Sequence, residues 1–201
     1  MRVGMTRDID GDWVGASPTM EEMEKALRNE VKKVDSSLDI QVNRIFGDRK
    51  SAGFKIVNEI GEKIASIDLS VRQNRFCSHY ISYINGVSIT GASLSKMLSV
   101  KIYAISGQNV CRRMKDVLDI YIMSFITKIN SDELYQIWRE NGRELGNFEV
   151  YKTQVTELNE AYNKMKGIKN KPDFIEVYQR VSDVVCKLEI QKEKTIFNRE
   201  S

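Results

Sequence analysis

The 201-residue chain is poor in the residues that cross-link or interrupt a polypeptide. Its 3 cysteines, Cys77, Cys111 and Cys186, lie far apart and form no C-x-x-C pair. A disulfide framework and a structural zinc site are therefore not expected. With only 2 prolines and 12 glycines, the composition resembles neither collagen nor a long disordered linker. A hydrophobic content of 41% is enough for one sizeable core or two small ones.

Long apolar runs and histidines are also scarce. No run approaches the roughly 18–20 apolar residues that span a bilayer, and residues 1–8 lack the apolar segment of a signal peptide. We therefore expect a cytoplasmic protein that has no membrane partner. His79 is the one histidine, which excludes a zinc site built on several histidines. Any metal ion is expected to be held by carboxylates, the ligands that suit Mg²⁺.

The charges are almost balanced. There are 31 basic and 28 acidic residues, which gives a net charge of +3. A chain with so small a net charge is not expected to bind nucleic acid nonspecifically along its whole surface, although a local basic patch remains an alternative. One such run contains four lysines without an intervening acid, and a solvated loop between helices is its simplest interpretation. The run comprises Lys164, Lys166, Lys169 and Lys171.

The hydrophobic pattern divides the chain into residues 1–92 and residues 93–201. The first part shows the period-two alternation of strands, and Pro18 and Thr19 precede a helical pattern. A helix is expected over 19–34, and strands over 40–46, 54–60, 63–71, 80–84 and 87–89, the last two joined by an Asn85–Gly86 turn. In the second part, helices are expected over 93–105, 114–126, 131–141, 148–166 and 172–192. We therefore expect an α+β fold, a mixed β-sheet with a helix followed by an α-helical bundle packed on it.

Three aspartates lie at strand positions that face away from the expected core. In a strand, Asp8 and Asp10 point to the face opposite Ile9, and their Cα atoms are roughly 7 Å apart. Asp68 likewise opposes the apolar alternation of residues 65–71. If the two strands are neighbours, the three carboxylates converge on one divalent cation, which offsets their mutual repulsion. The alternative is that each aspartate simply faces water from a half-buried strand.

Four segments together resemble one enzyme family. They are R-x-x-x-T-R-D-I-D over Arg2–Asp10, the strand acid in Ile67–Leu69, the segment Lys96–Ile102, and K-D-x-x-D-x-Y over Lys115–Tyr121. In this order and spacing, across residues 2–126, they resemble the nucleotidyltransferase superfamily. They resemble more particularly the AbiEii-like toxins, the nucleotidyltransferase half of AbiE-type toxin–antitoxin and abortive phage infection systems.

The resemblance implies a function and a site. Asp8, Asp10 and Asp68 would bind Mg²⁺ or Mn²⁺, and Asp68 would alternatively accept a proton from the attacking hydroxyl. A nucleotide-binding set would lie on the helices and comprise Lys101, Lys115, Asp116 and Asp119. The enzyme would transfer a nucleoside monophosphate from a nucleoside triphosphate to an RNA, a nucleotide or a protein hydroxyl, and a cognate antitoxin would be its protein partner.

One departure from the family supports an alternative function. The superfamily has a Gly-Gly or Gly-Ser turn shortly before its D-x-D, and that turn binds phosphates through backbone N–H groups. Here only seven residues precede Asp8, and Gly4 stands alone. The alternative is a catalytically degenerate protein that keeps the fold and acts as a binding module, for example for an antitoxin.

Two of the implied site residues interrupt apolar patterns. Lys101 falls in the apolar stripe of the expected helix 93–105, and Asp119 lies within the almost wholly apolar segment 117–126. One explanation is that Lys101 snorkels to water at the edge of the stripe. The other is that both charges face a cleft shared with Asp8 and Asp10, where Lys101 meets phosphate and Asp119 positions a cation or a lysine. In the second case, Lys101→Met keeps or raises thermal stability and loses nucleotide binding.

Overall fold

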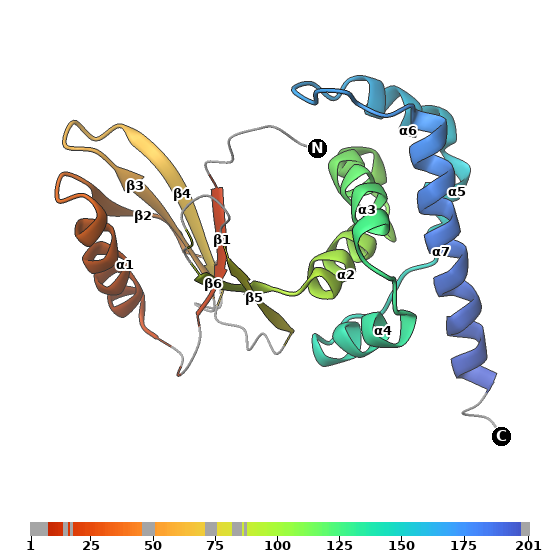
Figure 1. The fold of residues 1–201 in the computed structure, drawn as a ribbon, viewed down its shortest axis with the longest axis horizontal. Coiled ribbons are helices and arrows are strands. Elements are labelled where there is room, and N and C mark those ends of the chain that lie inside the picture. Colours follow the sequence, from red (N-terminus) through yellow and green to blue (C-terminus); the bar gives the residue numbers. More distant parts are fainter. Residues whose placement is uncertain are drawn as a thin grey trace. The chain divides into compact units, whose positions relative to one another are not determined.

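The chain folds into two compact units, each of which is described by itself. The computed structural model describes residues 8–13, 16, 18–45, 51–70, 76–81, 86 and 88–197. The division falls between residues 75 and 76. We call the described residues 8–70 the sheet unit and the described residues 76–197 the helical unit (Figure 1). The α+β class expected from the sequence is confirmed.

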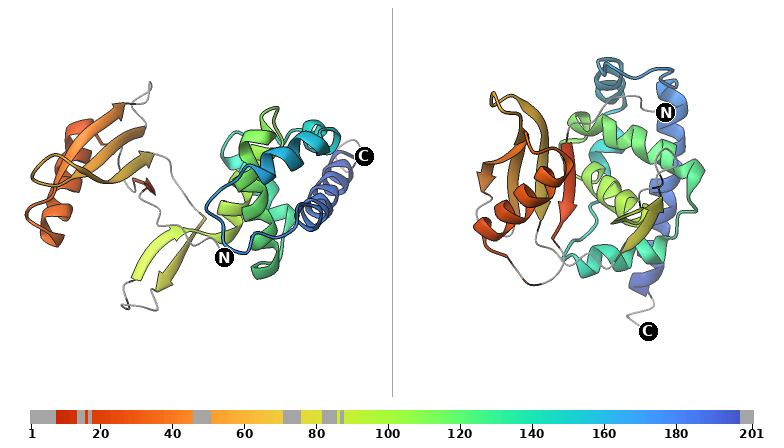
Figure 2. Two further views of the ribbon diagram at one scale, coloured as in Figure 1. Left: turned by 90° about the horizontal axis from the view of Figure 1, so that it is seen from above. Right: turned by 60° about the vertical axis from the view of Figure 1, so that its left-hand side comes forward.

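The sheet unit is a four-stranded mixed sheet with one helix. The strands are β1 (Asp8–Asp12), β2 (Asp39–Ile45), β3 (Ser51–Val57) and β4 (Lys63–Ser70), in the order β1-β4-β3-β2. β1 is parallel to β4, and β2, β3 and β4 are antiparallel neighbours. The helix α1 (Met20–Val34) connects β1 to β2 and lies along one face of the sheet (Figure 1; Figure 2, right).

Local sequence explains why α1 begins and ends where it does. Thr19 is its N-cap, and the capping box is complete because the Thr19 hydroxyl accepts from the Glu22 N–H while the Glu22 carboxylate accepts from the Thr19 N–H. Lys32 and Lys33 in the last turn favour the negative end of the helix dipole. The apolar stripe predicted for this helix packs on the sheet, where Met23 is buried. The predicted helix 19–34 is confirmed.

The core of the sheet unit is small. Its buried residues are Met23, Ile40, Ala52, Phe54 and Ile67. In the strand predicted over 54–60, Phe54 is buried, but Ile60 lies beyond β3 and is 81% exposed. The Asn58 side chain accepts from the Glu62 N–H at 2.7 Å and closes the turn, so β3 ends earlier than predicted. Phe46, the predicted end of strand 40–46, and Val71, the predicted end of strand 63–71, lie outside the described residues.

The helical unit begins with a hairpin rather than with a helix. β5 (Cys77–Ile81) and β6 (Ser88–Ala92) form a two-stranded sheet that leads directly into α2 (Leu94–Ile105) (Figure 2, left). The Ser93 N–H donates to the Phe76 carbonyl at 2.9 Å, which attaches the end of the hairpin to the start of α2. We expected the domain boundary at 92/93. It lies at 75/76, because the hairpin strands pair with each other and the hairpin is bonded to α2. Gly86 has a φ of +70°, as a type I′ turn requires; the remainder of the turn lies outside the described residues.

Helices make up the remainder of this unit. They are the short 3₁₀ helix Val110–Arg113, α3 (Met114–Ile126), α4 (Ser131–Glu140), α5 (Glu149–Thr153), α6 (Val155–Asn163) and α7 (Phe174–Phe197). α7 packs against α3, α4 and α6 (Figure 1). The bounds predicted for α3 are confirmed, and α7 extends five residues beyond the predicted 192. In the described part of the chain, no helix has both the length and the apolar character needed to cross a membrane.

The predicted helix over 148–166 is wrong as a single element. Gln154 has φ −99° and ψ 48°, which separates α5 from α6. Tertiary hydrogen bonds hold the two short helices separately: the Tyr151 hydroxyl donates to the Tyr178 carbonyl at 3.1 Å, and the Tyr162 hydroxyl donates to the Pro172 carbonyl at 2.8 Å. Burial raises the pKa of Tyr162 to about 12.

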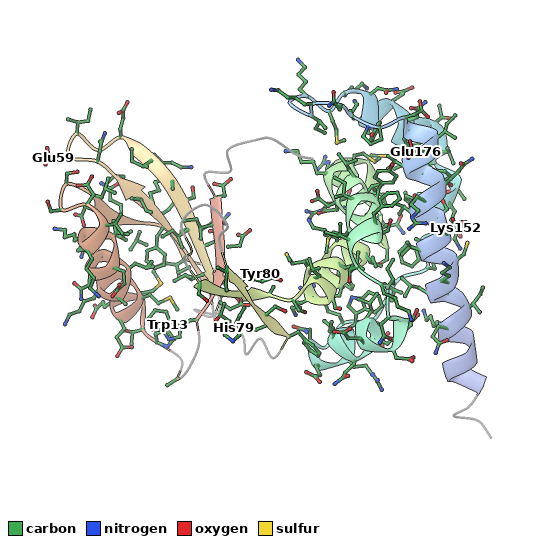
Figure 3. All side chains as sticks on the ribbon, in the orientation of Figure 1. Trp13, Glu59, His79, Tyr80, Lys152 and Glu176 are labelled. Carbon is green, nitrogen blue, oxygen red and sulfur yellow. The ribbon has the colours of Figure 1, made fainter. Side chains whose placement is uncertain are left out.

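Polar contacts also attach α7 to its neighbours. The Tyr121 hydroxyl of α3 donates to the Glu176 carboxylate, and this bond raises the pKa of Tyr121. The Lys152 ammonium of α5 donates at 2.6 Å to both carboxylate oxygens of Glu189, which raises the pKa of Lys152. Figure 3 labels Glu176 and Lys152 beside α7. The helix is therefore held by specific pairs as well as by its apolar stripe.

Candidate functional site

The register of β1 on β4 brings the predicted carboxylates onto one face. Asp10 lies directly opposite Asp68, and Asp8 lies opposite Ser66. Directly paired residues of neighbouring strands point to the same side, about 4.8 Å apart across the strands. Asp8, two residues before Asp10, shares that side. The predicted common face of Asp8, Asp10 and Asp68 is therefore confirmed by the register.

This polar face is the one that α1 leaves uncovered. Ile67, between Ser66 and Asp68, is buried in the core under α1. Ile9 is paired with Ile67 but belongs to an edge strand, and it is 52% exposed. Asp8 and Asp10 are both exposed. The sheet therefore presents its acidic residues to solvent and its apolar residues to α1.

A row of four residues crosses the polar face. The register places Asp10 of β1, Asp68 of β4, Gly53 of β3 and Arg44 of β2 side by side in that order. The Arg44 side chain passes over the glycine, and its Nη2 lies 3.5 Å from Asp68 Oδ1. A Cβ at position 53 would lie 2.9 Å from the same oxygen. Gly53 thus leaves the space in which the Asp68 carboxylate and the Arg44 side chain approach each other.

Sequence reasoning missed Arg44 and Gly53. A glycine in the interior of a strand is a weak signal for close approach of another group, and it was present in the sequence. Nothing in the local pattern identifies Arg44 as its neighbour, because a register shift between Val42 and Arg44 sets the pairing of that residue.

The neighbouring row repeats the separation of charge. Asp8 of β1 is followed across the sheet by Ser66, Lys55 and Gln41. Across the two rows, the three acidic side chains come from β1 and β4, whereas the two basic ones come from β3 and β2. The polar face therefore carries a carboxylate half and a cationic half.

The donor set of the carboxylate half suits a hard divalent ion. Among the described residues, no group of three or more acidic, histidine or cysteine side chains is arranged to hold a metal ion. Mg²⁺, however, commonly takes only one or two protein carboxylates and completes its shell with water and substrate phosphates. The expected convergence of the Asp8, Asp10 and Asp68 carboxylates on one cation is therefore not found, whereas Asp10 and Asp68, which the register places side by side, fit the smaller requirement.

The residues predicted on the helices form a second cluster, within the helical unit. The Lys101 ammonium of α2 donates to Asp119 at 2.7 Å and contacts Asp116 at 3.4 Å, both on α3. Lys101 is 25% exposed and Asp119 is 15% exposed. The Arg113 guanidinium lies 3.9 Å from Asp116. Lys101 and Asp119, which interrupt two separate apolar patterns in the sequence, are therefore each other's partners.

This pairing bears on both explanations of Lys101. Its ammonium does not simply extend to water, because it is bonded to a carboxylate that is mostly buried. Asp119 positions a lysine, as the second explanation expects, whereas the cleft shared with Asp8 and Asp10 remains a prediction. Lys115 lies on the same helix and is exposed. The nucleotide-binding role that the family resemblance implies for these two lysines and for Asp116 and Asp119 remains a prediction.

The pairing also reverses the stability expected of Lys101→Met. Removing the ammonium deprives two partly buried carboxylates of their shared cation, so we expect a loss of about 1–3 kcal/mol in the free energy of unfolding. Lys115→Met is the matched control, because the exposed ammonium is expected to contribute less than about 0.5 kcal/mol. Differential scanning calorimetry of both variants checks this. Equal melting temperatures would contradict the structural role of Lys101.

In a concave pocket elsewhere in the helical unit, the lysine ammonium is bonded to the protein itself. The pocket lies between the end of α6 and the start of α7, and Tyr162 and Lys171 are among its lining residues. The Lys171 ammonium donates to the Tyr162 carbonyl at 3.0 Å and lies 4.7 Å from the centre of the Tyr162 ring. This lysine of the basic run therefore stabilises the C-terminal end of α6.

Comparison with known proteins gives a likeness of fold. No protein-family model and no curated protein matches the chain. Among solved structures, the chain is similar to the crystal structure of JHP933 from Helicobacter pylori, with a TM-score of 0.50 and 13% sequence identity. The match covers 98% of this chain and 83% of that one. At this level of identity the likeness concerns the fold alone.

Proposed function

We propose that the protein is a Mg²⁺-dependent nucleotidyltransferase of the AbiEii toxin type, acting in the cytoplasm on an RNA, a nucleotide or a protein hydroxyl. The observation that carries the proposal is the register of β1 on β4, which sets Asp10 beside Asp68 on an exposed polar face. The order of the sequence motifs supports the same function. Mn²⁺ is the alternative ion, and an antitoxin is the proposed protein partner.

In the proposed reaction, the aspartates bind the metal ion or accept a proton. The acceptor oxygen forms a bond to the α-phosphorus of the nucleoside triphosphate, the bond from that phosphorus to the α–β bridging oxygen breaks, and pyrophosphate leaves with the electron pair. A bound Mg²⁺ would neutralise charge on the phosphates. Asp10 and Asp68 would hold the ion, with Asp8 beside them. Asp68 is alternatively the group that accepts the hydroxyl proton of the acceptor.

One observation favours the alternative, a catalytically degenerate binding module. Asp68 already has a cationic partner, because Arg44 Nη2 lies 3.5 Å from its carboxylate. A carboxylate paired in this way has less need of a metal ion. The two functions differ in one measurable property, the transfer of a nucleotide in the presence of Mg²⁺.

The test uses conservative changes at the paired aspartates. Asp10→Asn and Asp68→Asn keep the shape of each side chain and remove the charge that would bind the ion. We expect both variants of the full chain to lose transfer of label from α-³²P nucleoside triphosphates by at least about a hundredfold. Calorimetric titration with Mn²⁺ should show a parallel loss of cation binding. The circular dichroism spectrum should not change, because both side chains are exposed or half-exposed.

Glu59→Gln is the matched control. Glu59 is an exposed acid of the same unit at the β3–β4 turn, away from the polar row (Figure 3). Its removal should leave both measurements unchanged. If the unaltered protein binds no Mn²⁺ and transfers no nucleotide to RNA, to a nucleotide or to protein, the transferase function is wrong and the binding module stands.

A further inference from the structure

The polar row contains a cation that neither the sequence motifs nor the proposed reaction uses. Resting on the proposed function, we propose that Arg44 is a resident counter-ion of Asp68. It competes with the divalent cation for that carboxylate, and when the cation binds it is released to bind the phosphate chain of the nucleotide. The proposal concerns Arg44, Asp68 and Gly53, which adjoin one another across β2, β4 and β3.

The geometry describes a contact that is close but easily exchanged. The Arg44 Nη2 to Asp68 Oδ1 distance is 3.5 Å, longer than the 2.7–2.9 Å of a strong charge-assisted hydrogen bond. The Arg44 side chain is 56% exposed and that of Asp68 is 42% exposed. Exposed pairs of this kind contribute little free energy, typically about 0.2–1 kcal/mol. A divalent ion with a partner carboxylate on Asp10 therefore has only a weak competitor to displace.

The neighbouring charges explain how Arg44, once released from Asp68, would bind phosphate. A cation held by Asp10 and Asp68 would cancel the negative charge that attracts Arg44. The guanidinium would then lie beside a neutralised site, with Lys55 in the next row of the same face. A guanidinium fork and an ammonium next to a bound metal ion match a metal–polyphosphate ligand, in which the ion and the basic groups share the phosphate oxygens. The same carboxylates without a bound cation would repel that anion.

Gly53 leaves room for the Asp68 carboxylate at the position where Arg44 and the divalent cation would replace each other. A Cβ at this position would lie 2.9 Å from Asp68 Oδ1 and 3.4 Å from the Arg44 Cβ. Alanine here would therefore turn the Asp68 carboxylate away from its present position. The guanidinium and the divalent cation both require that position.

The experiment measures Mn²⁺ binding by isothermal titration calorimetry on the full chain. Arg44→Gln removes the competitor, so its affinity for Mn²⁺ should rise about 2–5-fold. Gly53→Ala displaces the carboxylate, so its affinity should fall instead. Lys63→Gln is the control for a lost positive charge, because Lys63 is an exposed residue at the first position of β4, five positions before Asp68. It should leave the affinity unchanged.

A second titration uses inorganic pyrophosphate in the presence of saturating Mn²⁺. Here Arg44→Gln should bind about tenfold more weakly than the unaltered protein, because a cation that holds the anion is lost. Arg44→Lys should restore part of that affinity. The same variant therefore strengthens binding of the cation and weakens binding of the anion, a combination that a purely structural role of Arg44 does not produce.

The outcomes separate this proposal from the transferase function. If the unaltered protein binds Mn²⁺ and Arg44→Gln binds it with the same or lower affinity, the counter-ion role is wrong and the metal site stands. Unchanged Mn²⁺ affinity in Gly53→Ala, or unchanged pyrophosphate affinity in Arg44→Gln, would equally overturn the exchange. If the Arg44→Gln variant binds Mn²⁺ and the unaltered protein does not, the competition between Arg44 and the cation is shown directly. If neither protein binds Mn²⁺, the metal site and the exchange both fail.

Discussion

We expect Gly146→Ala to lower the free energy of unfolding of the helical unit by about 3 kcal/mol, near the upper end of the usual effects of overpacking. A Cβ at position 146 would lie 2.3 Å from the carbonyl oxygen of Ser106 and 3.2 Å from its carbonyl carbon. Both are backbone atoms at the C-cap of α2, so no side chain can rotate to relieve the overlap. The flanking Leu145 and Phe148 are buried, which prevents the loop from simply moving outward.

Gly107→Ala is the matched control for this substitution. Position 107 follows Ser106 directly, and a Cβ built there meets no described atom within 4 Å. Thermal unfolding followed by circular dichroism should give a melting temperature close to that of the unaltered protein for Gly107→Ala. The Gly146→Ala variant should melt roughly 6–15 °C lower. Similar melting temperatures for the two variants would mean that the loop around position 146 moves away from the Ser106 backbone, contrary to the prediction.

The second large effect is expected for Trp138→Ala, at about 3–5 kcal/mol. Trp138 of α4 is 2% exposed, and its Nε1 donates to the Ser99 carbonyl of α2 at 2.9 Å. The Tyr135 ring packs against it edge-on at 5.3 Å between centroids. Alanine would remove the largest side chain among the fully buried residues of the unit and would leave a cavity between α2 and α4. Chemical denaturation of the full chain measures the loss.

Trp138→Phe separates packing from hydrogen bonding at the same position. Phenylalanine keeps much of the buried ring and loses the indole N–H, so we expect a smaller loss of about 1–2 kcal/mol. A Trp138→Ala variant as stable as Trp138→Phe would show that the site collapses around the missing ring. The cavity would then contribute little to the loss of stability.

Strong local patterns predict several elements with their bounds. Residues 114–126 carry few charges, and a helix of that character is expected to be buried. Most apolar side chains of α3 up to Met123 are buried, whereas Phe125 and Ile126 at its end are exposed. The capping residues Thr19 and Ser93 mark the starts of α1 and α2. The parity of Asp8, Asp10 and Asp68 predicts their shared face, because alternation along a strand fixes the side of the sheet on which each residue lies.

Tertiary pairing decides what local patterns leave open. Arg44 and Gly53 join the candidate site only through the register of β2 on β3, which contains a shift at the arginine itself. The ion pair of Lys101 with Asp119 depends on how α2 packs on α3, so the sequence shows two misplaced charges but not their contact. The break at Gln154 likewise lacks a glycine or proline signal. It follows from hydrogen bonds that Tyr151 and Tyr162 make with distant carbonyls.

The parallel pairing of β1 with β4 has a consequence for the order of folding. Asp10 and Asp68 are 58 positions apart in the chain, whereas β2, β3 and β4 are consecutive antiparallel neighbours. The entropy lost on closing a loop grows with its length, so we expect nearer strands to pair earlier and the longest closure to come last. Arg44 and Asp68 are already in place once β2, β3 and β4 have formed. We therefore expect the Arg44 guanidinium to lie beside Asp68 before β1 docks, so that the acidic pair of Asp10 and Asp68 is assembled last.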